Sequence, residues 1–229
     1  MGKLIKCHFC YLFNKITISI LIITILMVLF FSLFTASSFD ERIDFSIQTI
    51  NYYSSLYEII RIISLIFVSF FFGYSFFSTQ DGYHSIIIGK NVSRTKYLLS
   101  KEILLLNIFI FVYLIEITIM IIIGLMYHIV MDLNMLKSFI SLFLLLMIYG
   151  NYSVLLVLLF NNIYIVFIII PISLINFSKN IYFLSLVFPL EDRSMGISSF
   201  FLPSWYYVIL FLFTSIITII FWNRLDLPH

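Results

Sequence analysis

Residues 16–35 form a run of twenty amino acids without a charged side chain. At about 1.5 Å per residue, a helix of that length crosses the ~30 Å hydrocarbon layer of a bilayer. Of the 229 residues, 62% are hydrophobic and only 10% are charged, whereas soluble domains average about 45–50% and about 25%. The sequence therefore predicts an integral membrane protein. It leaves no room for a separate soluble domain of about 100–150 residues.

Further runs along the chain are also long and apolar enough to cross as helices. We predict six spans, at residues 16–35, 59–77, 103–127, 139–160, 163–177 and 205–222. Before the last span, residues 181–190 are apolar but too short to cross, which indicates a partly inserted or interfacial segment. The expected fold is an all-α membrane protein with one transmembrane domain over residues 1–229.

Residues 3–15 precede the first span and carry three lysines beside an apolar face formed by Leu4, Ile5, Tyr11 and Leu12. This pattern predicts an interfacial amphipathic helix. The lysines and the first apolar run also resemble a signal peptide, but the run exceeds the usual ~7–15 apolar residues, so we expect it to be retained.

Positive charge is distributed unevenly between the two sides that six spans define. Eight of the thirteen Lys and Arg residues fall on the side that holds both termini. Because cytoplasmic loops are enriched in Lys and Arg, we expect both termini to be cytoplasmic. The single alanine, Ala36, suggests an AT-rich coding bias, and hence a low-GC bacterium and a bacterial cell membrane.

Residues 80–102 form the long polar loop on that side. The other internal connection on that side, between spans four and five, is only the tight turn Asn161-Asn162. Four cations lie in this loop: Lys90, Arg94, Lys96 and Lys101. Ser93 is expected to cap the helix that becomes span three. Cations at a helix start are disfavoured by about 0.3–1 kcal/mol, so membrane topology or a partner surface must favour positive charge here.

The order of residues in this loop resembles that of type 2 ATP-binding-cassette (ABC) exporter permeases. In that family a short, glycine-containing coupling helix precedes a Ser-Arg…Tyr-Leu-Leu-x-Lys run. This chain has Asp81-Gly82, followed by Ser93-Arg94-Thr95-Lys96-Tyr97-Leu98-Leu99-Ser100-Lys101. The six-span plan is also similar. One departure is Ser78-Thr79-Gln80, where relatives often have an acidic residue.

The resemblance implies a permease that pairs with a second, identical or related, permease subunit and docks on a cytoplasmic ABC-type ATPase. It assigns residues 83–88 as the coupling helix. The ATPase-coupling residues it implies are Asp81, Gly82, Tyr83, His84, Ile86, Ile87, Arg94 and Lys101.

ATP and Mg are expected on that partner ATPase, with no cofactor in this chain. The phosphate-binding pattern Gly-x-x-x-x-Gly-Lys-[Ser/Thr] is absent from the sequence, because Asn91 follows Gly89-Lys90 and His84 replaces the first glycine. The chain is not expected to be an enzyme, since its four histidines are scattered and no His-Glu-x-x-His pattern occurs. Cys7 and Cys10 alone are a weak zinc signal, so we expect free thiols and no metal.

Glu116 lies near the middle of the third predicted span, where a charge costs a few kcal/mol to insert. Tyr149, Asn151 and Tyr152 lie at a similar depth in the fourth. We expect these side chains to face the interior, with Glu116 hydrogen-bonded to Asn151 directly or through a tyrosine. They form a candidate translocation path. Alternatively, a protonated Glu116 only ties two helices together.

Two further patterns concern helix packing and membrane anchoring. Ser69 and Gly73 have the small-x-x-x-small spacing that lets another helix approach closely, within the subunit or across a dimer. Tyr and Trp residues cluster near predicted span ends and are expected to anchor the protein at the membrane surface; they are Tyr52, Tyr53, Tyr57, Trp205, Tyr206 and Trp222.

The expected function is the permease of an ATP-driven exporter that moves hydrophobic or amphipathic cargo by alternating access. Peptides such as toxins are the first expectation for the cargo and lipids the second. One alternative is a secondary carrier in which Glu116 couples to a proton or cation. Another is a non-transporting membrane scaffold or immunity protein. Membrane lipid is an expected partner, and nucleic acid is not.

Overall fold

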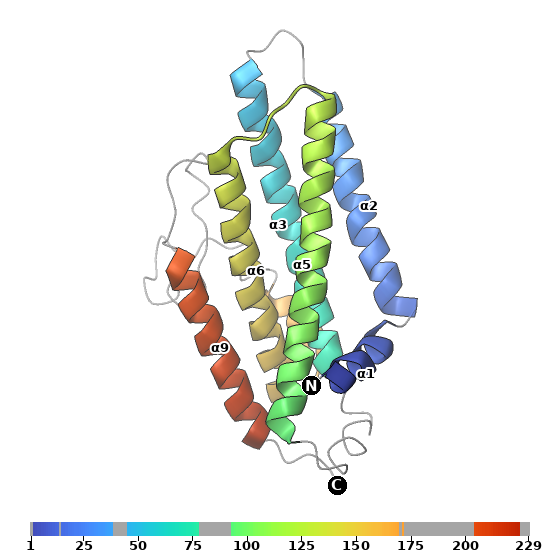
Figure 1. Ribbon diagram of the computed structural model, residues 1–229, viewed down its shortest axis with the longest axis vertical. Coiled ribbons are helices and arrows are strands. Elements are labelled where there is room, and N and C mark those ends of the chain that lie inside the picture. Colours follow the sequence, from blue (N-terminus) through green and yellow to red (C-terminus); the bar gives the residue numbers. More distant parts are fainter. Residues whose placement is uncertain are drawn as a thin grey trace.

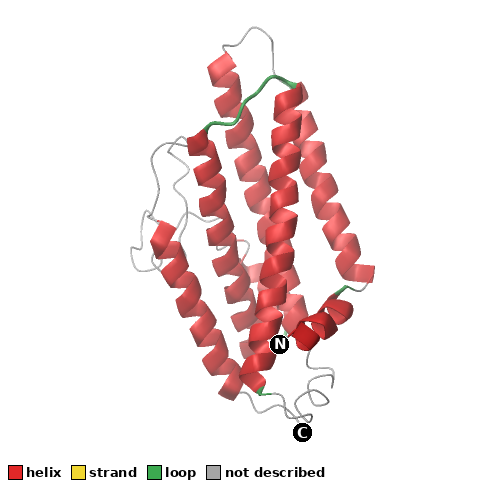
Figure 2. Ribbon diagram, viewed as in Figure 1, coloured by secondary structure: helices red, strands yellow, loops and turns green. Residues whose placement is uncertain are grey.

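A computed structural model describes residues 2–13, 15–38, 45–77, 93–169, 171 and 204–224. All regular structure in these residues is helical (Figure 2). The elements are α1 (Gly2–Leu12), α2 (Lys15–Ser37), α3 (Phe45–Phe77), α5 (Arg94–Met126), α6 (Leu133–Phe160), the 3-10 helix η2 (Ile163–Ile168) and α9 (Ser204–Arg224). Five of these helices, α2, α3, α5, α6 and α9, are long and apolar enough to cross a membrane. The predicted class, a helical multi-pass membrane protein, is confirmed.

Three helices begin well before the predicted spans. Helix α3 begins at Phe45 rather than residue 59, α5 at Arg94 rather than 103, and α6 at Leu133 rather than 139. A hydropathy pattern marks the part of a helix that lies in lipid, whereas the helix itself continues as long as caps and packing support it. Of the fifth predicted span, residues 170 and 172–177 lie outside the described residues, as do residues 181–190 and 78–92.

Helix α3 occupies the centre of the bundle and packs against α2, α5, α6 and η2. Figure 1 shows α2 and α9 at opposite edges. It also shows α1, the end of α3, the start of α5 and the end of α9 at one end of the bundle, which we call the α1 end. The segments on either side of the polar loop therefore meet at the same end as α1 and the last helix.

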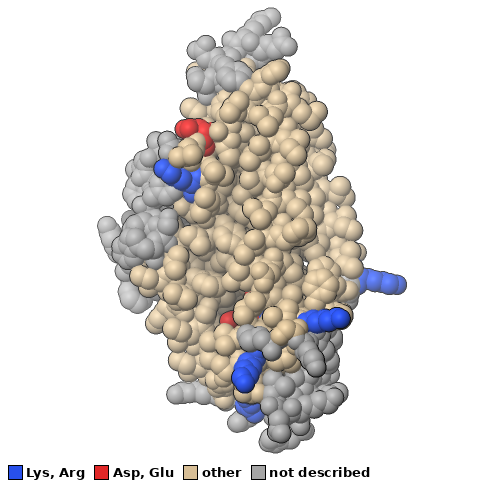
Figure 3. Space-filling model, in the orientation of Figure 1, with Lys and Arg blue, Asp and Glu red and all other residues tan. Residues whose placement is uncertain are grey.

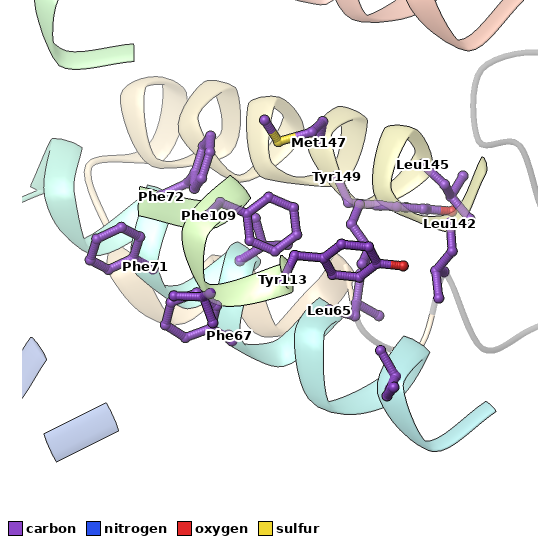
Figure 4. Close-up of a cluster of buried hydrophobic side chains, with 14 of the residues drawn as sticks. Leu65, Phe67, Phe71, Phe72, Phe109, Tyr113, Leu142, Leu145, Met147 and Tyr149 are labelled. Atoms are coloured by element: carbon purple, nitrogen blue, oxygen red, sulfur yellow. The ribbon is translucent and has the colours of Figure 1, made fainter. Parts of the chain in front are cut away.

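Aromatic rings fill the space between α3, α5 and α6 (Figure 4). Phe67 stacks on Phe71 at a centroid distance of 5.3 Å, and Phe109 stacks on Phe143 at the same distance. Tyr113 lies beside them, and its hydroxyl donates to the carbonyl oxygen of Phe139 over 2.6 Å. Lipid is as apolar as these rings, so close packing rather than escape from water holds the helices together.

The turn after α6 is as tight as the sequence predicts. Asn161 ends the helix in the left-handed conformation, with φ of 50°, which asparagine adopts more readily than most residues. The side-chain oxygen of Asn162 then accepts a hydrogen bond from the Tyr164 backbone N–H over 2.9 Å. Two asparagines thus end one helix and begin the next element.

Two tyrosines expected at the membrane surface are inside the protein. The Tyr52 hydroxyl donates to the Met120 carbonyl oxygen over 3.0 Å, and both Tyr52 and Tyr53 are fully buried. Trp222 is buried as well, so the anchoring role predicted for these three residues was wrong. Gly124 permits the tyrosine contacts, because a Cβ there would lie 2.9 Å from the Tyr53 hydroxyl oxygen.

The small-x-x-x-small spacing of Ser69 and Gly73 serves contacts within the subunit. A Cβ on Gly73 would lie 2.6 Å from Cγ2 of Val166 in η2 and 3.2 Å from Cγ2 of Val157 in α6. Ser69 is fully buried too. Glycine at position 73 therefore allows three elements to meet.

We predict that Gly73→Ala lowers the free energy of unfolding by about 1–3 kcal/mol through overpacking. Val166→Ala should partly rescue it by removing the clashing methyl group, which a double-mutant cycle in mild detergent would detect. Gly2→Ala is the control, since a Cβ there meets nothing within 4 Å. Equal destabilisation with and without Val166→Ala would contradict the packing described here.

Candidate functional site

A buried lysine joins two helices at the α1 end. Lys101 is only 1% exposed, although it lies close to the start of α5. Its Nζ donates a hydrogen bond to the carbonyl oxygen of Ser75 in the last turn of α3. Carbonyl oxygens at a helix C-terminus lack partners within the helix and carry partial negative charge. The end of α3 therefore supplies the hydrogen-bond acceptor and the partial negative charge that the buried amine of Lys101 needs.

Aromatic rings surround this lysine. Nζ of Lys101 lies 4.6 Å from the ring centroid of Phe76 and 5.9 Å from that of Tyr97. The Tyr97 ring stacks on Trp222, with centroids 6.1 Å apart, and Phe76 meets Trp222 edge-on. Helices α3, α5 and α9 are thus in contact through this group of side chains.

His8 attaches α1 to the same group. Its ring meets Tyr97 edge-on at 4.6 Å, and its Nε2 lies 3.1 Å from the Ser100 hydroxyl oxygen. That hydroxyl donates its own hydrogen to the Tyr97 carbonyl oxygen over 2.7 Å, so it accepts one from His8. We call the whole group the Lys101 cluster; it comprises His8, Ser75, Phe76, Tyr97, Ser100, Lys101 and Trp222.

The Lys101 cluster keeps the His8 imidazole neutral. Burial, together with the nearby charge of Lys101, lowers the pKa of His8 to about 4, and a backbone hydrogen bond with Tyr97 opposes this only in part. Sequence analysis missed His8. Its spacing was a usable signal, because His8 lies four residues before the buried Leu12 and so on the same side of α1.

The structure places two of the predicted ATPase-coupling residues. Arg94 is the first residue of α5, and Ser93 caps that helix as predicted, its hydroxyl accepting from the Lys96 backbone N–H over 3.4 Å. Lys101 lies inside the bundle, where it can affect a partner only through the helix ends. The other predicted coupling residues lie outside the described part of the chain: Asp81, Gly82, Tyr83, His84, Ile86 and Ile87.

Glu116 is fully buried in the bundle, facing α3. Its Oε2 accepts a hydrogen bond from the Ser64 hydroxyl over 2.7 Å, while Oε1 has no hydrogen-bond partner among the residues that the structure describes. A buried carboxyl oxygen without a partner is costly in a membrane, and such residues often mark functional sites.

Asn151 holds α9 against α6. Its Nδ2 donates to the hydroxyl oxygens of Ser215 over 2.8 Å and Thr214 over 3.1 Å. The predicted hydrogen bond between Glu116 and Asn151 was therefore wrong, although both residues face the interior. The reason is the central position of α3, which gives Glu116 a partner on one side while Asn151 turns toward α9.

Tyr149 and Tyr152 stay close to Asn151, with their ring centroids 6.1 Å apart. Tyr149 also lies within electrostatic range of Arg61, a buried cation on α3 that forms a 2.6 Å ion pair with Glu58. Sequence analysis did not predict that Arg61 would be buried. Its spacing of three residues from Glu58 was the available signal for an ion pair on one helix. The predicted path residues thus divide into two groups, one at Glu116 and one at Asn151.

Among the described residues, no group of three or more His, Cys, Asp or Glu side chains could hold a metal ion. Comparisons with known proteins found no matching family model, curated protein or solved structure. The chemistry of the Lys101 cluster and of Glu116 is therefore the basis for the proposals that follow.

We predict that Lys101→Glu destabilises the protein by about 3–5 kcal/mol, because it buries a negative charge against the carbonyl end of α3. Lys96→Glu is the matched control on the same helix. Lys96 is exposed in the first turn of α5, so an acidic residue there should be neutral or stabilising by up to about 1 kcal/mol. Thermal unfolding in mild detergent would measure the stability of both variants. Equal destabilisation by Lys101→Glu and Lys96→Glu would contradict the buried contact between Lys101 and the end of α3.

We predict that acid weakens the attachment of α1. In the folded protein, the His8 imidazole is packed in its neutral form. The stability that this packing contributes is complete above the pKa of about 6.5 of an unfolded histidine, and it is lost as the pH falls toward about 4. In His8→Gln, which keeps a donor for Ser100, the melting temperature should fall less between pH 7.5 and 4.5. Parallel curves for wild type and variant would show that His8 does not titrate in this range.

Proposed function

We propose that the chain is the membrane-spanning permease subunit of an ATP-driven exporter, coupled to a separate cytoplasmic ABC-type ATPase that binds ATP and Mg. The observation that carries this proposal is the Lys101 cluster. It links Ser75 and Phe76 at the end of α3 to Tyr97 and Lys101 at the start of α5. These are the helix ends that flank the polar loop resembling an ATPase-docking segment.

A force on that loop would reach the bundle through the Lys101 cluster. Residues 78–92 lie between Phe77 and Ser93, and the cluster joins the flanking helix ends to α1 through His8 and to α9 through Trp222. Closure of the ATPase would thus move four helices together. This fits alternating access, in which one group of helices moves relative to another.

Charge supports a cytoplasmic location for the α1 end. Most Lys and Arg atoms visible in Figure 3 lie near this end. Lys6 of α1, Lys15 at the start of α2 and Lys96 in the first turn of α5 are all exposed. Excess Lys and Arg is typical of the cytoplasmic side. The same cations suit an acidic surface on a partner subunit.

Hydrophobic or amphipathic cargo, a peptide first and a lipid second, fits the apolar bundle. Cargo would pass between this chain and a second permease subunit in a bacterial cell membrane. The polar side chains proposed for the translocation path form two buried groups within this chain, at Glu116 and at Asn151.

Co-purification tests the docking proposal. The tagged chain would be expressed with its neighbouring genes, extracted in mild detergent, and compared with Arg94→Glu and Lys137→Glu. Lys137 is an exposed cation near the start of α6 and serves as the matched control at the opposite end. A P-loop ATPase should be retained by wild type and Lys137→Glu and lost from Arg94→Glu. Its absence from wild type, or its retention by Arg94→Glu, would contradict docking at this loop.

A second candidate is a secondary carrier in which Glu116 binds a proton or cation. The observation that favours it is the buried Oε1 of Glu116, for which the described part of the chain supplies no hydrogen-bond partner. The two candidates differ in energy source: ATP depletion at a constant proton gradient stops only the ATPase-driven exporter. Full transport by a well-folded Glu116→Gln variant would exclude a carrier that depends on this carboxyl group.

A further inference from the structure

Arg61 is a buried cation on α3 whose hydrogen-bond donors are only partly used. Its side chain is 10% exposed, and its Nη2 lies 2.6 Å from Oε2 of Glu58. Its Nε is buried and has no hydrogen-bond partner among the residues that the structure describes. A guanidinium group carries five N–H donors and keeps its charge in a protein. Arg61 therefore has at least the N–H of Nε left for a further acceptor.

Arg61 lies in the half of the bilayer that is farther from the α1 end. Phe76 is at the α1 end, where it meets Trp222 edge-on. Arg61 precedes Phe76 by fifteen residues, which is about 22 Å of helix, and the hydrocarbon layer is ~30 Å thick. Side chains lean toward the N-terminus of their helix, and Figure 1 shows that α3 begins at the end of the bundle opposite α1. The guanidinium group is therefore directed toward that membrane surface.

A second contact sets the depth of Glu58. Tyr57, the residue before it, meets Phe139 of α6 with ring centroids 5.5 Å apart. Lys137, two residues before Phe139, is exposed, and its charge needs water or lipid headgroups around it. Glu58 is thus at headgroup depth, and its side chain is 44% exposed. The ion pair begins at the membrane surface and extends about one helical turn into the protein.

An apolar surface continues from this ion pair toward the middle of the bilayer. Ile62 and Ile66 follow Glu58 at intervals of four residues, which places all three along one side of α3. The two isoleucines are 37% and 42% exposed, although α3 is the central helix of the bundle. We call this surface the α3 strip; it consists of Glu58, Arg61, Ile62 and Ile66. It has a charged end at headgroup depth and an apolar part within the hydrocarbon layer.

The charged end of the α3 strip suits a phosphate group. A guanidinium group donates two parallel N–H bonds to phosphate, and arginine is better adapted to this contact than lysine. Glu58 is the anion that Arg61 contacts in the structure, through Nη2. Because the Glu58 side chain is almost half exposed, it can rotate into the headgroup layer and leave the guanidinium group to another anion. The phosphates of a bilayer lie at that level, just outside the hydrocarbon layer.

We propose that the α3 strip binds a phospholipid from the leaflet opposite the α1 end. The lipid phosphate takes the place of the Glu58 carboxylate and accepts hydrogen bonds from Nε and an Nη of Arg61. One acyl chain lies along Ile62 and Ile66. Phosphate and acyl chain thus contact the same side of one helix, at the depths that each occupies in a bilayer.

This lipid site does not depend on the proposed transport function. It requires only that the chain spans the membrane with Glu58 at headgroup depth. Its tests use the purified chain with neither ATP nor an ATPase, so their failure would leave the docking proposal intact.

Native mass spectrometry of the full-length protein in mild detergent tests the ligand. The probes are phosphatidylglycerol, diacylglycerol with the same acyl chains, and glycerol phosphate. One phosphatidylglycerol should be retained, and diacylglycerol should bind about 10- to 100-fold more weakly, because Arg61 then loses a charged hydrogen-bond partner. Equal binding of diacylglycerol would overturn phosphate recognition. Binding of glycerol phosphate as tight as that of phosphatidylglycerol would replace the lipid with a free anion.

Three variants test the residues. Arg61→Gln should bind phosphatidylglycerol about 10- to 100-fold more weakly than wild type. Glu58→Gln should bind it several-fold more tightly, because the carboxylate that competes for Arg61 is gone. Lys137→Gln removes an exposed cation at similar depth on α6 and should change binding by less than about twofold.

The Glu58→Gln result separates a lipid site from an ion pair that only stabilises α3. Unchanged or weaker phosphatidylglycerol binding by Glu58→Gln would overturn the exchange of carboxylate for phosphate. Equal binding by wild type and Arg61→Gln would overturn the site itself. If Arg61→Gln does not fold, a variant with both Glu58→Gln and Arg61→Gln takes its place, because it leaves no unpaired charge in the protein. Wild-type affinity in that double variant would likewise overturn the site.

Discussion

A buried lysine needs acceptors, and Lys101 finds its acceptor where α3 ends. Lys101 lies two turns into α5 and is buried, so its amine is cut off from water and must find an acceptor on a neighbouring helix. The end of the antiparallel helix α3 supplies that acceptor. Once Lys101 is held there, Tyr97 and Phe76 are fixed around it, and Trp222 and His8 pack against Tyr97. This hydrogen bond thus lies where α1, α3, α5 and α9 meet.

Elsewhere, polar side chains act as specific links between helices whose remaining contacts are apolar. Ser64 and Glu116 link α3 to α5, and Asn151 links α6 to α9 through Thr214. Such links contribute only about 0.6 kcal/mol on average, so close packing supplies most of the attraction between helices. Their value lies in orientation, because each link is satisfied in only one rotation of its helix.

The sequence was sufficient to predict the helical class and most spans, because lipid demands long apolar helices. It also predicted the Ser93 cap and the Asn161 turn, which depend on local chemistry. It was insufficient for the partners of Glu116 and for the burial of Tyr52. Those depend on which helix lies next to which, and α3 takes the central position through aromatic contacts that no single-helix pattern reveals.

The length of α3 and α5 affects how the protein fits a bilayer. Each has 33 residues, about 50 Å of helix, which exceeds the ~30 Å hydrocarbon thickness. Their outer parts remain joined because the Tyr52 hydroxyl binds the Met120 carbonyl oxygen. A thicker membrane would therefore meet existing helix rather than unfolded chain. The pair can accommodate differences in bilayer thickness by tilting, with little loss of backbone hydrogen bonding.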